Sequence, residues 1–196
     1  MFAVLILVLI MQRTFELVLA ERNRRWSRAR GGKESGGRHY RVIVAVHALF
    51  YLSLVLERRY WSHGWNPVWP VWLALVLGAQ FVRLWAIHSL GRAWNTRIIV
   101  IPGMTPVERG PYRFIRHPNY LVLIIEMFAI PVLCGDYVTA IVFSVANGVI
   151  LARRIPEEER AMEQAHGAPL RRLPRFFPRR QTDPAPAGRD SGTQKL

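Results

Sequence analysis

The chain has 196 residues, of which 51% are hydrophobic, and it carries a formal net charge of +14. Its length suits one domain, but a positive mean hydropathy and long runs with almost no charge exclude an ordinary soluble domain and predict an integral membrane protein. The single cysteine, Cys134, excludes an internal disulfide framework.

Five apolar segments follow one another along the chain. They cover residues 1–20, 42–56, 68–88, 120–134 and 137–152. The first has roughly the ~20 residues that a helix needs to cross the hydrocarbon, and it lacks the basic start and cleavage site of a removed signal peptide. The last two are separated only by Gly135 and Asp136. At ~1.5 Å per residue each is shorter than the ~30 Å hydrocarbon core, which predicts a tight helical hairpin, tilted or incomplete.

The basic residues alternate between the connections. The first connection is rich in them, the second has only Arg58 and Arg59, the third is basic again, the turn at 135–136 has none, and the chain after residue 152 is strongly basic. By the positive-inside rule this predicts an outside N-terminus and a cytoplasmic C-terminus. The predicted fold class is therefore an all-α, multi-pass protein of the cell membrane, with about five transmembrane helices.

The residues before the fourth segment form a first polar cluster, Gly110-Pro-Tyr-Arg-Phe-Ile-Arg-His-Pro-Asn-Tyr120. A residue before proline avoids the helical region, and proline suits the first helical position, so the fourth helix is predicted to begin at Pro118. We expect the early N–H groups of Asn119 and Tyr120 to be unpaired and to suit a carboxylate or a ribose oxygen. An interfacial belt that anchors the helix end in the headgroups is the alternative.

A second cluster, Arg153-Arg-Ile-Pro-Glu-Glu-Glu159, follows the fifth segment. Pro156 either kinks a continuing helix or begins a new one, whose first turn would hold the glutamates. If the helix continues, Arg154 and Glu158 are four residues apart on one face and point back toward His117. A carboxylate there can accept hydrogen bonds from a ribose diol or an amine, and an arginine can pair with an anionic substrate.

Together the two clusters are similar to a known family. The pattern Gly110-x-Tyr112-x₃-Arg116-His117-Pro118-x-Tyr120, an apolar hairpin and Arg154-Ile-x-x-Glu158-Glu159 resembles the isoprenylcysteine carboxyl methyltransferase family of membrane methyltransferases. The resemblance covers residues 95–178, and Trp94, Asn95, Asn119, Glu126 and Asn147 are similar to its small bacterial branch. It implies a cytoplasm-facing pocket for the methyl donor S-adenosyl-L-methionine and a lipophilic small-molecule acceptor that arrives from the bilayer.

The family's functional positions transfer residue by residue. The donor-binding positions that the resemblance implies are Met104, Thr105, Pro106, Val107, Tyr112, His117, Pro118, Asn119, Tyr120 and Glu158. Arg154 falls on a substrate-contacting arginine. The chain departs from the family at Val122, where glycine is common, and in a shortened tail at 166–178. Both departures concern the wall on which acceptor choice depends.

The implied reaction is O-methylation of a lipophilic anion, a carboxylate or an alkylpyrone- or resorcinol-like hydroxyl. We predict that Arg154 steers the acceptor and that Glu158 and the helix end at His117 hold the donor; a phenolic acceptor would need a base, for which His117 is the candidate. Isoprenylcysteine carboxyl or phospholipid N-methylation are enzymatic alternatives. A non-catalytic basic membrane anchor is another, whereas nucleic-acid binding lacks a groove-reading or stacking element.

Some ionisable and polar residues lie inside apolar segments. Arg13 and Glu16 are expected to pair across one helical turn, and Gln80 and Arg83 to bond between helices or face the substrate. His47 is expected to be a satisfied interior histidine, and no histidine shows the spacing of a metal site.

Three regions are predicted along the chain. Residues 1–89 form a three-helix membrane region, residues 90–178 form the methyltransferase core, and residues 179–196 form a disordered tail. Gly31 to Gly37 is expected to be a flexible loop.

Overall fold

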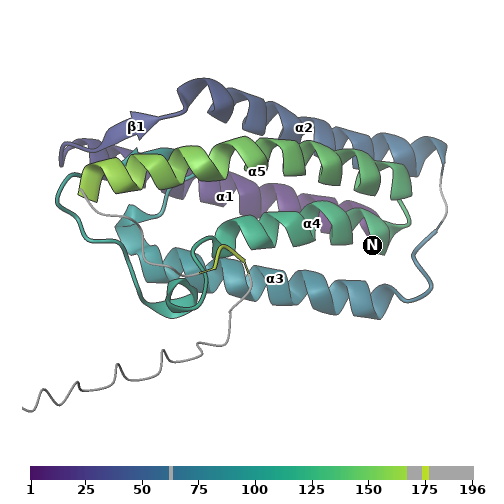
Figure 1. Ribbon diagram of the computed structural model, residues 1–196. Coiled ribbons are helices and arrows are strands. Elements are labelled where there is room, and N and C mark those ends of the chain that lie inside the picture. The colour runs from purple at the N-terminus through teal and green to yellow at the C-terminus, as the bar shows by residue number, and fades with distance from the viewer. Residues whose placement is uncertain (62–63, 167–173, 177–196) are drawn as a thin grey trace, which may run out of the picture.

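The computed structural model describes residues 1–61, 64–166 and 174–176. In these ranges five α-helices lie side by side (Figure 1). They are α1 (Phe2–Arg28), α2 (Gly37–Tyr60), α3 (Trp69–Leu90), α4 (Pro118–Cys134) and α5 (Tyr137–His166). The shorter elements are β1 (Lys33–Ser35), the 3₁₀ turn η1 (Gly91–Ala93), β2 (Ile98–Val100) and the 3₁₀ turn η2 (Gly110–Arg113). The α1–α2 and α3–α4 connections meet at one end of the bundle, here called the loop end (Figure 1).

The helices have the length and composition of a membrane protein. Four segments are long and apolar enough to cross a bilayer: Phe2–Arg28, Tyr40–Tyr60, Trp69–Ala93 and Tyr137–Ala165. Large apolar side chains such as Val18, Phe81 and Val145 are exposed on these helices, as a lipid-facing surface requires. The predicted integral membrane protein is thus confirmed. At 17 residues α4 is about 25 Å long, below the ~30 Å hydrocarbon thickness.

The predicted hairpin is formed by α4 and α5. Gly135 ends α4 in the left-handed region, with φ 80°, where glycine has no Cβ to clash. From the neighbouring α2, the Glu57 carboxylate accepts hydrogen bonds from the N–H groups of Val138 (3.0 Å) and Thr139 (2.7 Å). A carboxylate at this position pairs free N–H groups of the helix start and favours its dipole, so α2 fixes where α5 begins.

The last helix is longer than its apolar stretch. The sequence left open whether Pro156 ends the fifth helix, but α5 continues through Pro156 to His166, for 30 residues or about 45 Å. The estimate of a short last segment is therefore wrong for α5. Because the helix continues, Arg154 and Glu158 share one face of it.

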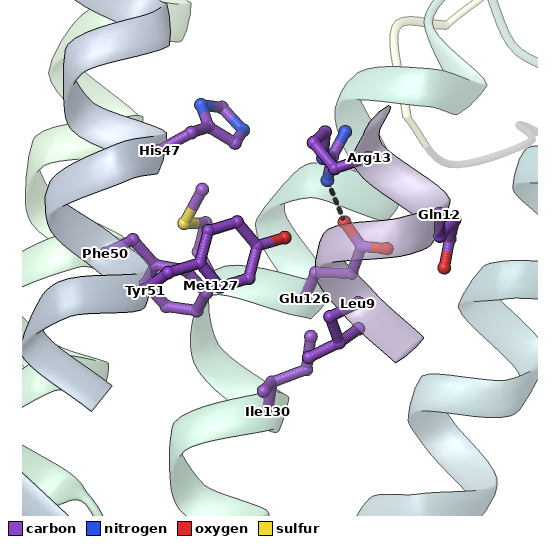
Figure 2. Close-up of a pocket in the computed structure, with 9 residues that line it drawn as sticks. All are labelled: Leu9, Gln12, Arg13, His47, Phe50, Tyr51, Glu126, Met127 and Ile130. Atoms are coloured by element: carbon purple, nitrogen blue, oxygen red, sulfur yellow. Dashed lines mark hydrogen bonds and ion pairs between the residues drawn. The ribbon is translucent and has the colours of Figure 1, made fainter. Parts of the chain in front are cut away.

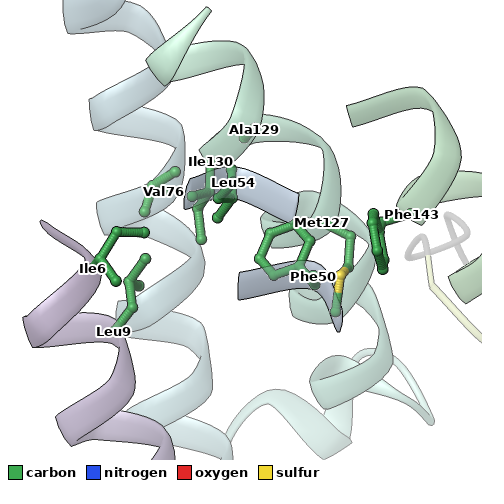
Figure 3. Close-up of a cluster of buried hydrophobic side chains, with 9 residues drawn as sticks. All are labelled: Ile6, Leu9, Phe50, Leu54, Val76, Met127, Ala129, Ile130 and Phe143. Carbon is green, nitrogen blue, oxygen red and sulfur yellow. The ribbon is translucent and has the colours of Figure 1, made fainter. Parts of the chain in front are cut away.

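The apolar core joins all five helices (Figure 3). Its buried members are Ile6 and Leu9 of α1, Phe50 and Leu54 of α2, Val76 of α3, Met127, Ala129 and Ile130 of α4, and Phe143 of α5. Phe50 and Phe143 pack edge to face with ring centroids 5.5 Å apart, a favoured aromatic geometry. This core lies away from the loop end.

A short ribbon corrects the expectation of a flexible loop at residues 31–37. β1 pairs antiparallel with β2, and Glu34 lies opposite Ile99. Arg28 and Arg97 reach Glu34 at 2.6 and 2.5 Å. Burial opposes ionisation of Glu34, but the hydrogen bonds from Arg97 and Arg28 outweigh it and hold the pKa of the carboxyl below its usual value. The ribbon thereby ties the α1–α2 connection to the α3–α4 connection. The predicted tail, residues 179–196, lies outside the described residues.

Candidate active site

A cavity of about 830 Å³ opens beneath the ribbon at the loop end. This volume lies within the ~300–1,000 Å³ that ligand sites usually have. Its walls come from all five helices and the α3–α4 connection, and most of the lining is apolar. All predicted donor residues, namely Met104, Thr105, Pro106, Val107, Tyr112, His117, Pro118, Asn119, Tyr120 and Glu158, line it together with Arg154. The fold brings the two sequence clusters to one cavity.

Three of these residues form a hydrogen-bonded chain across the α4–α5 hairpin. Arg154 Nε donates to the Tyr120 hydroxyl at 2.7 Å, and that hydroxyl donates to the Glu158 carboxylate. Arg154 Nη2 also donates to the carbonyl of Thr96 at 2.6 Å. Arg154 is only 7% exposed. A buried cation and a carboxylate are therefore held on either side of one tyrosine, each in a fixed position at the cavity wall.

Hydrogen-bond donors lie on the other side of the hairpin start. Asn119 Nδ2 donates to the Tyr112 hydroxyl at 3.0 Å, which leaves the hydroxyl proton of Tyr112 available to a ligand. Burial first, and the charge of Glu158 second, raise the pKa of Tyr112, so it stays a neutral donor. Asn95 lines the cavity as well, and its Nδ2 is buried with no hydrogen-bond partner among the described residues. Such an atom is costly unless a ligand or a water pairs with it.

His117 is held by Glu159, which the sequence named as part of the second motif without assigning it a role. Its Nε2 lies 3.0 Å from Glu159 Oε1, not at Glu158, and the His117 ring is 6% exposed. Arg116 and Arg175 also pair with Glu159, at 2.9 and 2.6 Å. Because α5 continues through Pro156, Glu159 lies at this position. In the sequence it is one of three adjacent glutamates, and nothing there distinguishes it as the partner of His117. Glu159 thus orients the imidazole.

The chain beyond α5 also reaches the first cluster. The N–H groups of Arg116 and His117 donate to the carbonyls of Pro174 and Arg175, at 3.0 and 3.1 Å. Phe176 packs against the apolar cluster of Tyr120, Leu151 and Ile155. The described part of the shortened tail therefore braces the loop that precedes α4.

The start of α4 is partly as predicted. The helix begins at Pro118, with His117 at the cap position. The expectation of a free N–H at Tyr120 is wrong, because it donates to the carbonyl of His117 at 3.1 Å. This hydrogen bond at the helix cap occupies the N–H group of Tyr120. A ligand must therefore be held mainly by side chains.

The cavity extends from the loop end to a charge network, which we define as Gln12, Arg13, Glu16, Gln80, Arg83 and Glu126. Arg83 Nη1 donates to both oxygens of Glu16 at 3.1 and 3.0 Å, and Arg83 also pairs with Glu126. Arg13 pairs with Glu16 at 2.8 Å and with Glu126 at 3.3 Å. The expected Arg13–Glu16 pair and the interhelical bonds of Gln80 and Arg83 are thus confirmed. Two arginines and two glutamates balance each other between α1, α3 and α4.

Comparison with known proteins decides the family. The model of the isoprenylcysteine carboxyl methyltransferase (ICMT) family matches residues 72–164. An uncharacterized protein of Bacillus subtilis, YpbQ, is 42% identical over 164 residues, which cover 84% of this chain and 98% of that protein. The chain belongs to the ICMT family. The matched segment, residues 72–164, contains both motif clusters. The first begins at Gly110 and the second ends at Glu159.

Two further relatives bear on the activity and on the branch of the ICMT family. Protein-S-isoprenylcysteine O-methyltransferase A of Arabidopsis thaliana is 30% identical over 140 residues, 66% of each chain. An uncharacterized protein of Haemophilus influenzae is 27% identical over 151 residues, 76% of this chain and 88% of that protein. Family membership supports a membrane methyltransferase, and the bacterial relatives support a small bacterial ICMT-like branch.

Proposed function

We propose that this protein uses S-adenosyl-L-methionine to methylate an oxygen of a lipophilic, anionic acceptor at the cytoplasmic face of the cell membrane. The observation that carries the proposal is the chain Arg154–Tyr120–Glu158 at the wall of the 830 Å³ cavity. It places a cation suited to an anionic acceptor beside a carboxylate suited to hydroxyl and amine donors. The acceptor that we propose carries a carboxylate or an alkylpyrone- or resorcinol-like hydroxyl.

The residues around the cavity fit the donor. S-Adenosyl-L-methionine supplies, when bound, an electrophilic methyl group on a sulfonium. Glu158 provides the carboxylate for a ribose diol or an amine, and Tyr112 provides a neutral hydroxyl donor. The unpaired Nδ2 of Asn95 adds a buried donor on the same wall. Met104 to Val107 contribute an apolar edge against which a base ring can pack.

Arg154 is suited to the acceptor. Its two hydrogen bonds, to the Tyr120 hydroxyl and the Thr96 carbonyl, fix the guanidinium before any ligand arrives. An anion that enters the cavity therefore meets a pre-oriented and largely buried cation, where the pairing is stronger than in solution. Positioning of two reactants can supply ~7–11 kcal/mol of a barrier. A carboxylate or an enolate is already ionised near neutral pH, so this arrangement needs no dedicated base.

His117 has a different part in the proposal. Because Glu159 holds its Nε2 and the tail carbonyl of Arg175 holds its backbone N–H, the residue is rigid. We propose that it shapes the donor site and that it takes a proton only from a neutral, phenolic acceptor.

The name of one relative suggests a more specific acceptor, the carboxylate of a prenylated cysteine. The Arabidopsis protein is by name a protein-S-isoprenylcysteine O-methyltransferase, and the carboxylate of a prenylated cysteine belongs to the same class of lipophilic anion. A phospholipid amine is matched less well, because Arg154 would repel a cationic acceptor at the site where it should approach.

Donor binding tests the proposal. Purified protein in detergent micelles is titrated with S-adenosyl-L-methionine by isothermal calorimetry, together with Glu158→Gln and the matched control Glu157→Gln, whose residue does not line the cavity. We expect the wild type and the control to bind alike. A hydrogen bond to a charged group contributes ~1.5–3 kcal/mol, so Glu158→Gln should bind about ten- to hundredfold more weakly. A wild type that does not bind the donor would overturn the proposed function, and unchanged affinity in Glu158→Gln would remove that residue from the site.

A further inference from the structure

The charge network does more than join helices, because three of its members, Arg13, Glu16 and Arg83, reach the wall of the cavity. The side chains of Glu16, Arg83 and Glu126 are only 4 to 5% exposed, whereas Arg13 is 21% exposed. A network that served only to join α1, α3 and α4 would be expected to pack closed on all sides, because unpaired charge is costly within a membrane. Of the network residues that line the cavity, Arg13 has the most exposed side chain.

Two polar residues of α2 lie across from Arg13. Figure 2 shows His47 and Tyr51 on the opposite side of a small pocket from Arg13, which pairs with Glu126. The pocket measures about 10 Å³, room for roughly one water molecule, and its walls include Gln12. Arg13, His47 and Tyr51 also line the main cavity. Their polar groups therefore converge on one place from two helices.

The imidazole of His47 has one nitrogen that can accept a hydrogen bond from a ligand. Its Nδ1 lies 2.8 Å from the carbonyl oxygen of Ile43, and because a carbonyl can only accept, Nδ1 carries the proton. The other nitrogen, Nε2, is then an acceptor in the neutral ring. Arg13 supplies donors and His47 an acceptor, and the Tyr51 hydroxyl, which is hydrogen-bonded to Arg13, has its own proton to donate.

This place lies deep in the bundle. Arg13 is ten residues before Asn23, which binds the carbonyl of Trp94 at the loop end, and His47 is seven residues beyond Tyr40, which packs under Arg97 of the ribbon. At ~1.5 Å per helical residue both stand about 10–15 Å from the loop end. Between the two ends the cavity is lined by apolar side chains such as Leu17, Ile43 and Val44.

We propose that Arg13, His47 and Tyr51 form a second polar subsite at the inner end of the cavity. It binds an oxygen-bearing group, a hydroxyl or a carbonyl, on the part of the lipophilic acceptor that is furthest from the methylated oxygen. The identification of the bound molecule as the methyl acceptor rests on the proposed function. The binding of such a molecule at this subsite rests on the cavity alone. The acceptor is then an amphiphile with a polar group at each end of an apolar chain.

The test compares two ligands that differ in one hydroxyl, dodecanoic acid and 12-hydroxydodecanoic acid. Their dissociation constants are measured with the wild type, Tyr51→Phe and His47→Phe in the same detergent micelles. Partitioning of each ligand into the micelles then cancels in the ratio of variant to wild type. Neither substitution removes a charge from the network, so the fold is preserved. Tyr60→Phe is the matched control, since Tyr60 lies on the same helix, is 69% exposed and does not line the cavity.

One lost hydrogen bond corresponds to about a three- to tenfold change in affinity. We expect each subsite variant to weaken binding of 12-hydroxydodecanoic acid by this factor and to leave the affinity for dodecanoic acid unchanged. The control should alter neither affinity. Equal losses for the two ligands, no loss for either, or failure of the wild type to bind the hydroxylated chain would overturn the subsite. Because these are binding measurements, they remain decisive if donor binding fails and the proposed methyl transfer is wrong.

Discussion

The two polar regions of this bundle are built in opposite ways. At the loop end, Arg154, Tyr120 and Glu158 form an open chain, and Asn95 leaves a donor atom unpaired. In the charge network each arginine contacts both glutamates, and the two charges of each sign cancel. The loop end can draw on water when no ligand is bound, whereas unpaired charge at membrane depth is expensive. Unpaired hydrogen-bonding groups therefore mark the proposed site of chemistry, and closed pairing marks the contacts that join the helices. Arg13 is the one partly exposed cation among the described network residues.

Removing one charge from the closed region should have the largest effect. Arg83→Met leaves Glu16 and Glu126 buried with only Arg13 between them. Loss of one partner from a buried ion pair costs about 3–5 kcal/mol. We expect a markedly lower unfolding temperature in detergent, followed by fluorescence of the tryptophans. Arg41→Met, an exposed cation of α2, is the control and should unfold as the wild type does. An unchanged midpoint for Arg83→Met would contradict a structural network.

At the open region, substitution should impair turnover more than stability. Arg154→Gln removes the oriented cation but leaves Glu158 in place. We expect methyl transfer from labelled S-adenosyl-L-methionine into a membrane lipid extract to fall about a hundredfold, as misplacement of a reactant does. Donor affinity should change much less. Arg153→Gln, an exposed neighbour on α5, should retain activity. Wild-type turnover in Arg154→Gln would remove the acceptor role.

A smaller effect is expected from the neutral donor at the same end. Tyr112→Phe removes a hydroxyl whose proton is available because the hydroxyl accepts from Asn119. Calorimetry should show donor affinity reduced about three- to tenfold, the usual contribution of one neutral hydrogen bond. Tyr137→Phe, at the opposite end of the bundle, should leave the affinity unchanged. If the two variants bind alike, Tyr112 does not contact the donor.

The ribbon that covers the cavity should show the smallest effect, and one that depends on pH. Although burial opposes ionisation, Arg97 and Arg28 hold the pKa of Glu34 below its usual value, so the ion pairs stabilise the ionised carboxyl. Their contribution is present above the unfolded pKa and is lost as pH falls through the folded one. The unfolding temperature of Glu34→Gln should therefore lie below that of the wild type at pH 7, and the two should converge on acidification. A difference that stays constant down to pH 3 would show that the ion pairs do not stabilise the ribbon.

The sequence predicted those features that depend on local chemistry. Charge-free runs revealed the apolar segments, Pro118 marked the start of α4, and Gly135 with Asp136 marked the hairpin turn. Family resemblance then placed ten donor positions that all line one cavity. Each of these signals lies within a few residues of the feature that it predicts.

Features that depend on distant partners could not be predicted. β1 and β2 have three residues each, too short for a periodic pattern, and they exist because Lys33–Ser35 meets Ile98–Val100 in space. Glu159 became the partner of His117 only because α5 does not stop at Pro156. Arg13 and Arg83 were recognisable as unusual, but Glu126, which both contact, lies more than forty residues from either.

The central claim is that the open region at the loop end binds the methyl donor. Ultraviolet cross-linking of methyl-labelled S-adenosyl-L-methionine to the protein in micelles, followed by peptide mapping, tests it most directly. We predict label on the peptides that contain residues 104–120 and 154–162, displaced by excess unlabelled donor and much reduced in Glu158→Gln. Displaceable label on the α1 and α2 residues of the charge network, or no displaceable label anywhere, would contradict the assignment.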